Sequence, residues 1–230
     1  MIVDLHVHTF PASTCSTIAR HELIDHCREH QLRAVALTNH GSIEDNRELE
    51  LPLAEGGVTL IHGVEISTLY GDFLIYSPDL DYLARFKDVD AVPLAGSLAG
   101  DAALVWAHPA AGGGRSGSTF YEGLADVVAP FIDAVEVWNG NWSDERYVTA
   151  AQRVADDLGL PATGGSDAHR VERIGRCTTE IDREVASTAD VVAAIKSGAV
   201  APVPPQGQGQ AQGLGRVFGR FGRRNDRTDR

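Results

Sequence analysis

Histidine and carboxylate side chains recur where the apolar runs of this sequence end. His6 and His8 are separated by one residue in Asp-Leu-His-Val-His, inside a segment typical of a β-strand. Because alternate side chains of a strand point to the same face, both imidazoles can chelate one ion. Further metal-ligand residue types follow later runs, namely His40, Glu65, His108, Asp167 and His169. The set is large enough to hold more than one cation.

The donor types narrow the choice of metal. Imidazole and carboxylate groups without thiolates suit Zn, Mn or Fe(II) better than Cu(I) or iron–sulfur clusters. Two or three such ions close together would activate water and stabilise negative charge on a phosphoryl group. We therefore expect two or three divalent metal ions (Zn, Mn or Fe) as cofactors. His26 and His30 are four residues apart in a charged helical pattern, and we interpret them as solvent-facing.

The elements that must position these residues alternate along the chain. Short β-branched and aliphatic runs predict strands over residues 2–8, 34–39, 59–66, 73–76, 103–107, 134–138 and 162–164. Helical patterns cover 18–31, with Thr17 as a candidate cap, and 143–158 and 188–197, which stop at Gly159 and Gly198. The alternation indicates an α/β fold. In a barrel-like arrangement, the C-terminal strand ends converge on one mouth.

These segments together resemble a known family. DLHVHT, the segment around His40, GVE, WAHP, EVWNG and GGSDAH occur in the order and spacing of the PHP (polymerase and histidinol phosphatase) superfamily. The resemblance to a histidinol-phosphatase-like metal-dependent phosphoesterase covers residues 1–203. It implies a distorted seven-stranded β/α barrel with a bi- or trinuclear metal centre that hydrolyses phosphoesters.

The resemblance also distributes the ligands. It implies that one ion is bound by His6, His8, Glu65 and Asp167. Glu65 would bridge to a second ion, which His108 also binds. His40 and His169 resemble the ligands of a third site.

Four departures from the family pattern leave roles open. Asn39 precedes His40 where many members have Asp. Cys15 lies in a Ser-Thr-Cys-Ser segment where many members have Asp or His, and is either a ligand or a packed thiol. Asp72 stands where some relatives have His. The strand around Val135 offers Glu136 and Asn139 in place of the remaining second-site ligand.

The expected reaction is hydrolysis of a phosphoester, most simply a small-molecule or nucleotide phosphate monoester, by a hydroxide that bridges two ions. His169 would protonate the leaving group. Arg115, after a glycine-rich loop, and Arg176 are candidates for binding the phosphate. Histidinol phosphate, nucleoside phosphates and short oligonucleotide ends all remain compatible substrates.

Charge divides the chain into two parts. The whole chain has a net charge of −12, whereas residues 204–230 carry six Arg against two Asp in a Gly/Gln/Arg-rich sequence that predicts a disordered tail. Residues 1–203 are predicted to form one domain. The negative net charge of this domain disfavours nucleic-acid binding except through the basic tail. Two rival functions are a catalytically silent metal-binding module and an exonuclease acting on nucleic-acid ends.

Location is predicted from simpler features. Three cysteines without a CxxC pair argue against a disulfide framework. We find no apolar run of membrane-spanning length and no export signal at the start, so a cytoplasmic location is expected. Oligomeric state and native metal stay open.

Overall fold

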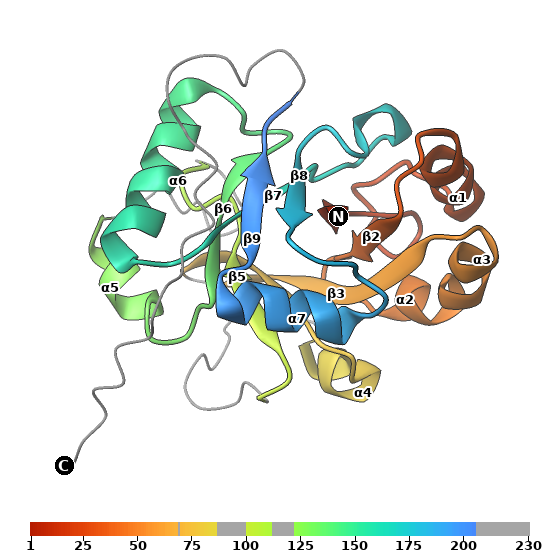
Figure 1. Cartoon of the computed structure of the whole chain (residues 1–230), viewed down its shortest axis with the longest axis horizontal. Coiled ribbons are helices and arrows are strands. Elements are labelled where there is room, and N and C mark those ends of the chain that lie inside the picture. Colours follow the sequence, from red (N-terminus) through yellow and green to blue (C-terminus); the bar gives the residue numbers. More distant parts are fainter. Residues whose placement is uncertain (69, 87–99, 112–121, 206–230) are drawn as a thin grey trace.

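The computed structural model describes residues 1–68, 70–86, 100–111 and 122–205, and Figure 1 gives their arrangement. The predicted phosphate-binding Arg115 and all of the predicted tail except Pro204 and Pro205 lie outside the described residues. No helix in the described ranges is long and apolar enough to cross a bilayer.

The described residues form a nine-stranded sheet in the order β7-β6-β5-β4-β3-β2-β1-β8-β9. The strands are β1 (Ile2–Val7), β2 (Ala34–Leu37), β3 (Thr59–Thr68), β4 (Gly71–Tyr76), β5 (Ala103–Trp106), β6 (Ala134–Asn139), β7 (Ala162–Gly165), β8 (Thr178–Ile181) and β9 (Val200–Val203). The pairs β1–β2, β2–β3, β5–β6 and β6–β7 are parallel, and the others are antiparallel. Parallel neighbours bring the ends of β1, β3, β6 and β7 to a common edge.

The sheet curls so that β7, the strand at one end of the sheet order, lies beside β1. A parallel bridge joins Val7 to Ala168, and the His8 N–H donates to the Ala168 carbonyl at 3.0 Å. The approach is close because Gly165 has no side chain. A Cβ on Gly165 would lie 2.4 Å from the Cβ of His6. The result is a distorted, nearly closed barrel.

Helices cover the outside of this barrel. In Figure 1, α1 (Arg20–Glu29), α2 (Glu44–Glu48) and α3 (Glu50–Glu55) lie on one flank, with α5 (Glu122–Val128) and α6 (Glu145–Leu158) on the other. The remaining helical segments are α4 (Leu80–Leu83), η1 (Ala84–Phe86), η2 (Val171–Arg173) and α7 (Thr188–Ser197). Helix α6 buries Val148, Ala151 and Val154 in the cluster that contains Val135 and Val137 of β6.

Two of the three helix-end residues predicted from the sequence, the glycines that end α6 and α7, are found at helix ends. Gly159 ends α6 and Gly198 ends α7, both with left-handed backbone conformation, as predicted. The predicted cap of the first helix was wrong. Helix α1 begins at Arg20, because Thr17 donates its hydroxyl to the His169 carbonyl at 3.1 Å instead of capping the helix.

The α/β class and the predicted strands were confirmed, with shifts at their ends. The strand number differs, because β8 and β9 were not predicted. Both strands are antiparallel to their neighbours and follow β1 at one end of the sheet order. Pro202 interrupts the strand-like sequence of the β9 segment, although it is paired with Thr179 in the sheet.

Candidate metal centre

The two histidines of the first motif meet inside the barrel. His6 and His8 are fully buried, and their Nε2 atoms are 3.1 Å apart. The Nδ1 atoms point away from this meeting point, toward Glu136 Oε1 at 3.0 Å for His6 and toward Ser13 Oγ at 3.3 Å for His8. Such partners fix the ring orientation and leave Nε2 available as the ligand atom.

Glu65 of β3 lies at the centre of the cluster and is 2% exposed. Its Oε2 is 3.0 Å from His40 Nδ1 and 3.2 Å from His8 Nε2. Its Oε1 is 3.3 Å from His108 Nε2. One carboxylate oxygen therefore faces His8 and His40 and the other faces His108, an arrangement that a bridging ligand requires.

Asp167 and His169 enter from the loop after β7. Asp167 Oδ1 is 3.5 Å from His6 Nε2 and 3.4 Å from His8 Nε2. Asn139 donates to Asp167 Oδ2 at 3.3 Å, and Asn141 donates to its carbonyl at 2.7 Å. Asp167 has a positive φ of 50°, a costly conformation that these contacts hold in place.

His108 is held in the same manner after β5. Its φ is 27°, and its backbone N–H donates to Glu136 Oε2 at 3.0 Å. One buried carboxylate, Glu136, thus orients the His6 ring and fixes the His108 backbone. The backbone is thus strained at both Asp167 and His108, and strained backbone at ligand-type residues is typical of functional sites.

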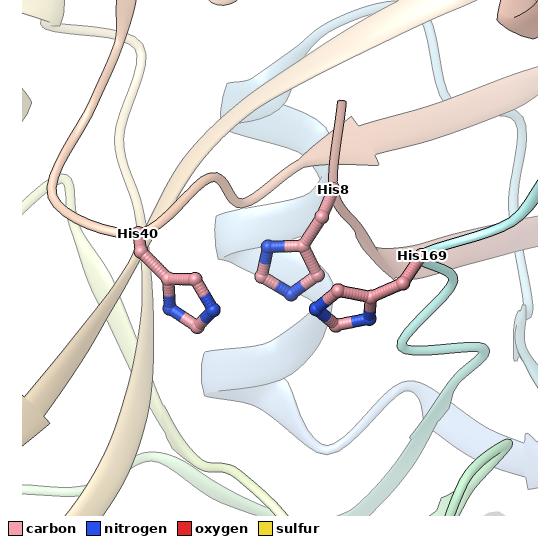
Figure 2. A group of neighbouring side chains, drawn as sticks. All are labelled: His8, His40 and His169. Carbon is pink, nitrogen blue, oxygen red and sulfur yellow. The ribbon is translucent and has the colours of Figure 1, made fainter. Parts of the chain in front are cut away.

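The structure brings all the predicted metal ligands together as three overlapping groups. Within each group, the ligand atoms lie within 4.8 Å of one another, and the groups are His6–His8–Asp167, His6–Glu65–His108 and His8–His40–His169. Figure 2 shows the last group, in which the His8 ring lies between those of His40 and His169. Their role as ligands stays a prediction.

The charges in this cluster are strongly coupled. Burial lowers the pKa of His6, but the carboxylates of Asp167, Glu136 and Glu65 outweigh it and raise that pKa well above its ordinary value. The pKa of His108 rises to about 9, because its hydrogen bond to Glu65 and nearby carboxylates outweigh burial. Burial opposes ionisation of Glu65, yet the charge on His6 and the hydrogen bonds from histidines hold its pKa well below the usual range. Carboxylates kept ionised are the form that binds cations.

Buried carboxylate oxygens show that the cluster fits divalent cations. Asp72 Oδ1 is buried without a hydrogen-bond partner in the described part of the chain, and Glu65 Oε2 is buried beside the ring nitrogens of His8 and His40. Burial and the charge of Glu65 raise the pKa of Asp72. Buried polar atoms without partners are costly unless a ligand satisfies them. A donor set of imidazoles and carboxylates of this kind fits divalent metal ions.

Cys15 is exposed and lies between β1 and α1 in the chain. Burial raises its pKa, but hydrogen bonds with His169 and His40 outweigh it and lower the pKa to about 6. The other two cysteines, Cys27 and Cys177, are buried in the core.

Several supporting residues could not be assigned from sequence. Asn39 accepts from the Thr9 N–H at 2.8 Å and donates to its hydroxyl at 2.9 Å, so it shapes the loop after β1. Glu136 and Asn139, whose roles the family pattern leaves open, hydrogen-bond to His6 and Asp167 respectively. A carboxylate within the otherwise apolar Ala-Val-Glu-Val-Trp strand was the signal for Glu136.

The two predicted arginines are not part of the described cluster. Arg176 is exposed in the turn before β8, and the described residues give its side chain no hydrogen bond or ion pair with the ligand groups. Arg115 lies outside the described residues. Their phosphate-binding roles stay predictions.

Comparisons with known proteins agree with the fold. A PHP-associated family model matches residues 146–200. PsfC from Pseudomonas syringae is 20% identical with a TM-score of 0.62, over 89% of this chain and 91% of that chain.

Two further solved structures are similar over most of this chain. A two-domain protein from Bacteroides vulgatus, containing a predicted PHP-like metal-dependent phosphoesterase, is 18% identical with a TM-score of 0.66; the match covers 89% of this chain but only 65% of that protein. A proposed metal-dependent phosphoesterase from Bifidobacterium adolescentis is 15% identical with a TM-score of 0.60, over 84% of this chain and 95% of that chain. No curated protein matches the sequence.

Proposed function

We propose that this chain is a member of the PHP superfamily and a metal-dependent phosphoesterase that hydrolyses a phosphate monoester of a small molecule or nucleotide; the partial PHP-associated match and the shared fold support this. The observation that carries the proposal is Glu65, whose two oxygens face His8 and His108 on opposite sides of one buried carboxylate. This arrangement suits two cations at the short separation that phosphoryl hydrolysis uses.

The protein's own residues would divide the work. His6, His8, Glu65 and Asp167 would hold one cation, and Glu65 and His108, with Asp72 as a further candidate, would hold a second. When bound, the cations would supply Lewis acidity and a water of lowered pKa. Glu136 would keep His6 and His108 in position, so that little reorganisation accompanies the reaction.

Exposure indicates the side from which substrate would enter. The side chains of His6 and His8 are fully buried, whereas those of His40 and His169 are 42% and 28% exposed. Substrate would therefore approach beside His40 and His169. Since His169 Nδ1 lies 2.9 Å from the Asp167 carbonyl, its Nε2 remains to hold a proton for the leaving oxygen.

The test is hydrolysis by protein loaded separately with Mn, Zn or Fe(II). Substrates would be p-nitrophenyl phosphate and a panel of phosphate monoesters and nucleotides. We expect turnover that is lost in the His6→Ala/His8→Ala double variant. The matched control is His26→Ala/His30→Ala, which removes a neighbouring pair of stacked rings from the partly exposed side of α1 and should retain activity.

Each alternative has a distinct outcome. Full metal occupancy with no hydrolysis of any substrate would refute the proposal and favour a silent metal-binding module. Hydrolysis confined to polynucleotides, salt-sensitive and lost on removal of residues 206–230, would favour an exonuclease instead.

A further inference from the structure

A network of polar side chains runs from the loop after β1 to the surface. Three of its members, Thr9, Asn39 and Asp45, are fully buried. The Asn39 amide Nδ2 donates to Thr9 Oγ1 at 2.9 Å, and the Thr9 hydroxyl donates to Asp45 Oδ2. Asp45 Oδ1 accepts from Arg20, at 2.7 Å from Nε and 2.6 Å from Nη2. The Arg20 side chain is 31% exposed, so the network ends at solvent.

The direction of hydrogen-bond donation is fixed from the Asp45 end. A carboxylate paired with Arg20 acts only as an acceptor, so Thr9 must give its single hydroxyl hydrogen to Asp45. Thr9 Oγ1 can then only accept from position 39, which therefore needs a donor. The Asn39 amide supplies that donor with Nδ2 and keeps Oδ1 for the Thr9 N–H at 2.8 Å. A carboxylate at position 39 would instead place two acceptors on a hydroxyl with one hydrogen.

The same residues hold three of the predicted metal ligands. Thr9 directly follows His8, and Asn39 directly precedes His40. The Asn39 carbonyl accepts from the Glu65 N–H at 3.2 Å, and a parallel bridge joins His40 to Glu65. Glu65 Oε2 lies 3.2 Å from His8 Nε2 and 3.0 Å from His40 Nδ1. A shift of Asn39 relative to Thr9 would therefore move these three ligands relative to one another.

We propose that Asn39 is a positioning residue for the metal centre, acting through Thr9, and that the pairing of Asp45 with Arg20 requires an amide at position 39. This requirement accounts for Asn at a position where many members of the resembled family have Asp. The inference rests on the proposed metal centre but not on the proposed reaction. Partners that orient metal ligands in this way typically account for about 10–100-fold in metal affinity.

The first test separates position from charge. Asn39→Asp adds a negative charge near the cations, and attraction alone would tighten their binding. If the direction of donation governs, two carboxylates compete for the Thr9 hydrogen, and zinc affinity should fall at least about tenfold in competition with a chromophoric chelator. The matched control is Gln31→Glu, which adds the same charge at an exposed position between α1 and β2 and should bind as wild type. Affinity in Asn39→Asp equal to or above that of the wild type would overturn the inference.

The second test reverses the direction of donation. In the double variant Asn39→Asp/Asp45→Asn, which keeps the wild-type net charge, the amide at position 45 donates to Thr9 Oγ1 and the Thr9 hydroxyl donates to the carboxylate at position 39. Arg20 retains Glu44 and Glu48 as partners. We expect zinc affinity within about threefold of wild type, although each single variant binds more weakly. A loss as large as the two single losses combined would overturn the inference.

The third test removes the shared hydroxyl. Thr9→Val leaves Asn39 Nδ2 and Asp45 Oδ2 without this partner, so zinc affinity should fall about tenfold. Thr9→Ser retains the hydroxyl and should bind within about threefold of wild type. Urea unfolding of each metal-free variant gives its folded fraction under the titration conditions, so that affinity refers to folded protein. Equal affinities of the two variants would overturn the inference.

The outcomes separate this inference from the proposed function. Unchanged zinc affinity in Asn39→Asp, with phosphoester hydrolysis by the wild type, overturns the positioning role and leaves the phosphoesterase proposal intact. Binding that is weakened and then rescued, without hydrolysis by the wild type, supports the positioning role and refutes the reaction. Failure of the wild type to bind any divalent cation overturns both.

Discussion

Gly165 offers the sharpest test of how strand packing sets the metal centre. An alanine Cβ there would lie 2.4 Å from His6 Cβ and 2.7 Å from Glu136 Oε1, where ordinary contact begins at 3.4 Å. Strands β7 and β1 would have to separate by about 1 Å to relieve this overlap. Overpacking of this kind costs about 1–3 kcal/mol of unfolding free energy.

The same displacement reaches the ligands. His6 is on β1 and Asp167 follows Gly165 by two residues, so the two ligands would move apart. Metal–ligand distances tolerate only about 0.2 Å. We therefore expect Gly165→Ala to lower cation affinity at least tenfold, or about 1.4 kcal/mol.

The assay combines denaturant unfolding of the metal-free protein with competition titration of zinc against a chromophoric chelator. The control is Gly100→Ala, because an added Cβ at Gly100 meets no atom of the described residues within 4 Å. Wild-type stability and affinity in Gly165→Ala would refute the claim that close approach of β7 to β1 builds the centre.

Three further predictions concern charge. Glu136→Gln should weaken cation binding about 10–100-fold, because it removes the charged acceptor of His6 Nδ1, while the exposed Glu145→Gln should bind normally in the same titration. Asp72→Asn should stabilise the metal-free protein by about 1 kcal/mol in urea unfolding, because it removes a buried carboxyl near Glu65; an unchanged midpoint would contradict this. Because the pKa of His108 is raised, its protonated ring stabilises the fold at pH values below its ordinary pKa of about 6.5, and this stabilisation is lost as pH rises through about 9. Over that range the stability of the metal-free protein should fall and its cation affinity should rise. Stability and affinity that do not change with pH would be inconsistent with the cluster.

Local periodicity was sufficient to predict the strands that carry the ligands. The spacing of His6 and His8 predicts that both rings point to the same side of the first strand, and in the fold their Nε2 atoms meet at the end of β1. Gly159 and Gly198 likewise end helices for a local reason, because glycine readily adopts the left-handed backbone conformation found at both positions.

Contacts across long sequence separations were not predictable in this way. Thr17 had the residue type of a helix cap, but its hydroxyl is used by a carbonyl 152 residues away. The support that Glu136 gives to His6 spans 130 residues, and the positive φ of Asp167 depends on its neighbours in space. Such features follow from closure of the barrel, which no single segment specifies.

The inner and outer halves of the centre have different foundations. His6 and Glu65 are on buried strands, whereas His40 and His169 depend on the short β1–α1 loop through Ser13 and Thr17. A change in a strand disturbs the whole barrel, but a change in that loop alters only what it touches. Substitutions confined to the β1–α1 loop would therefore reach the surroundings of His40 and His169 first, and would leave the strands that carry His6 and Glu65 in place.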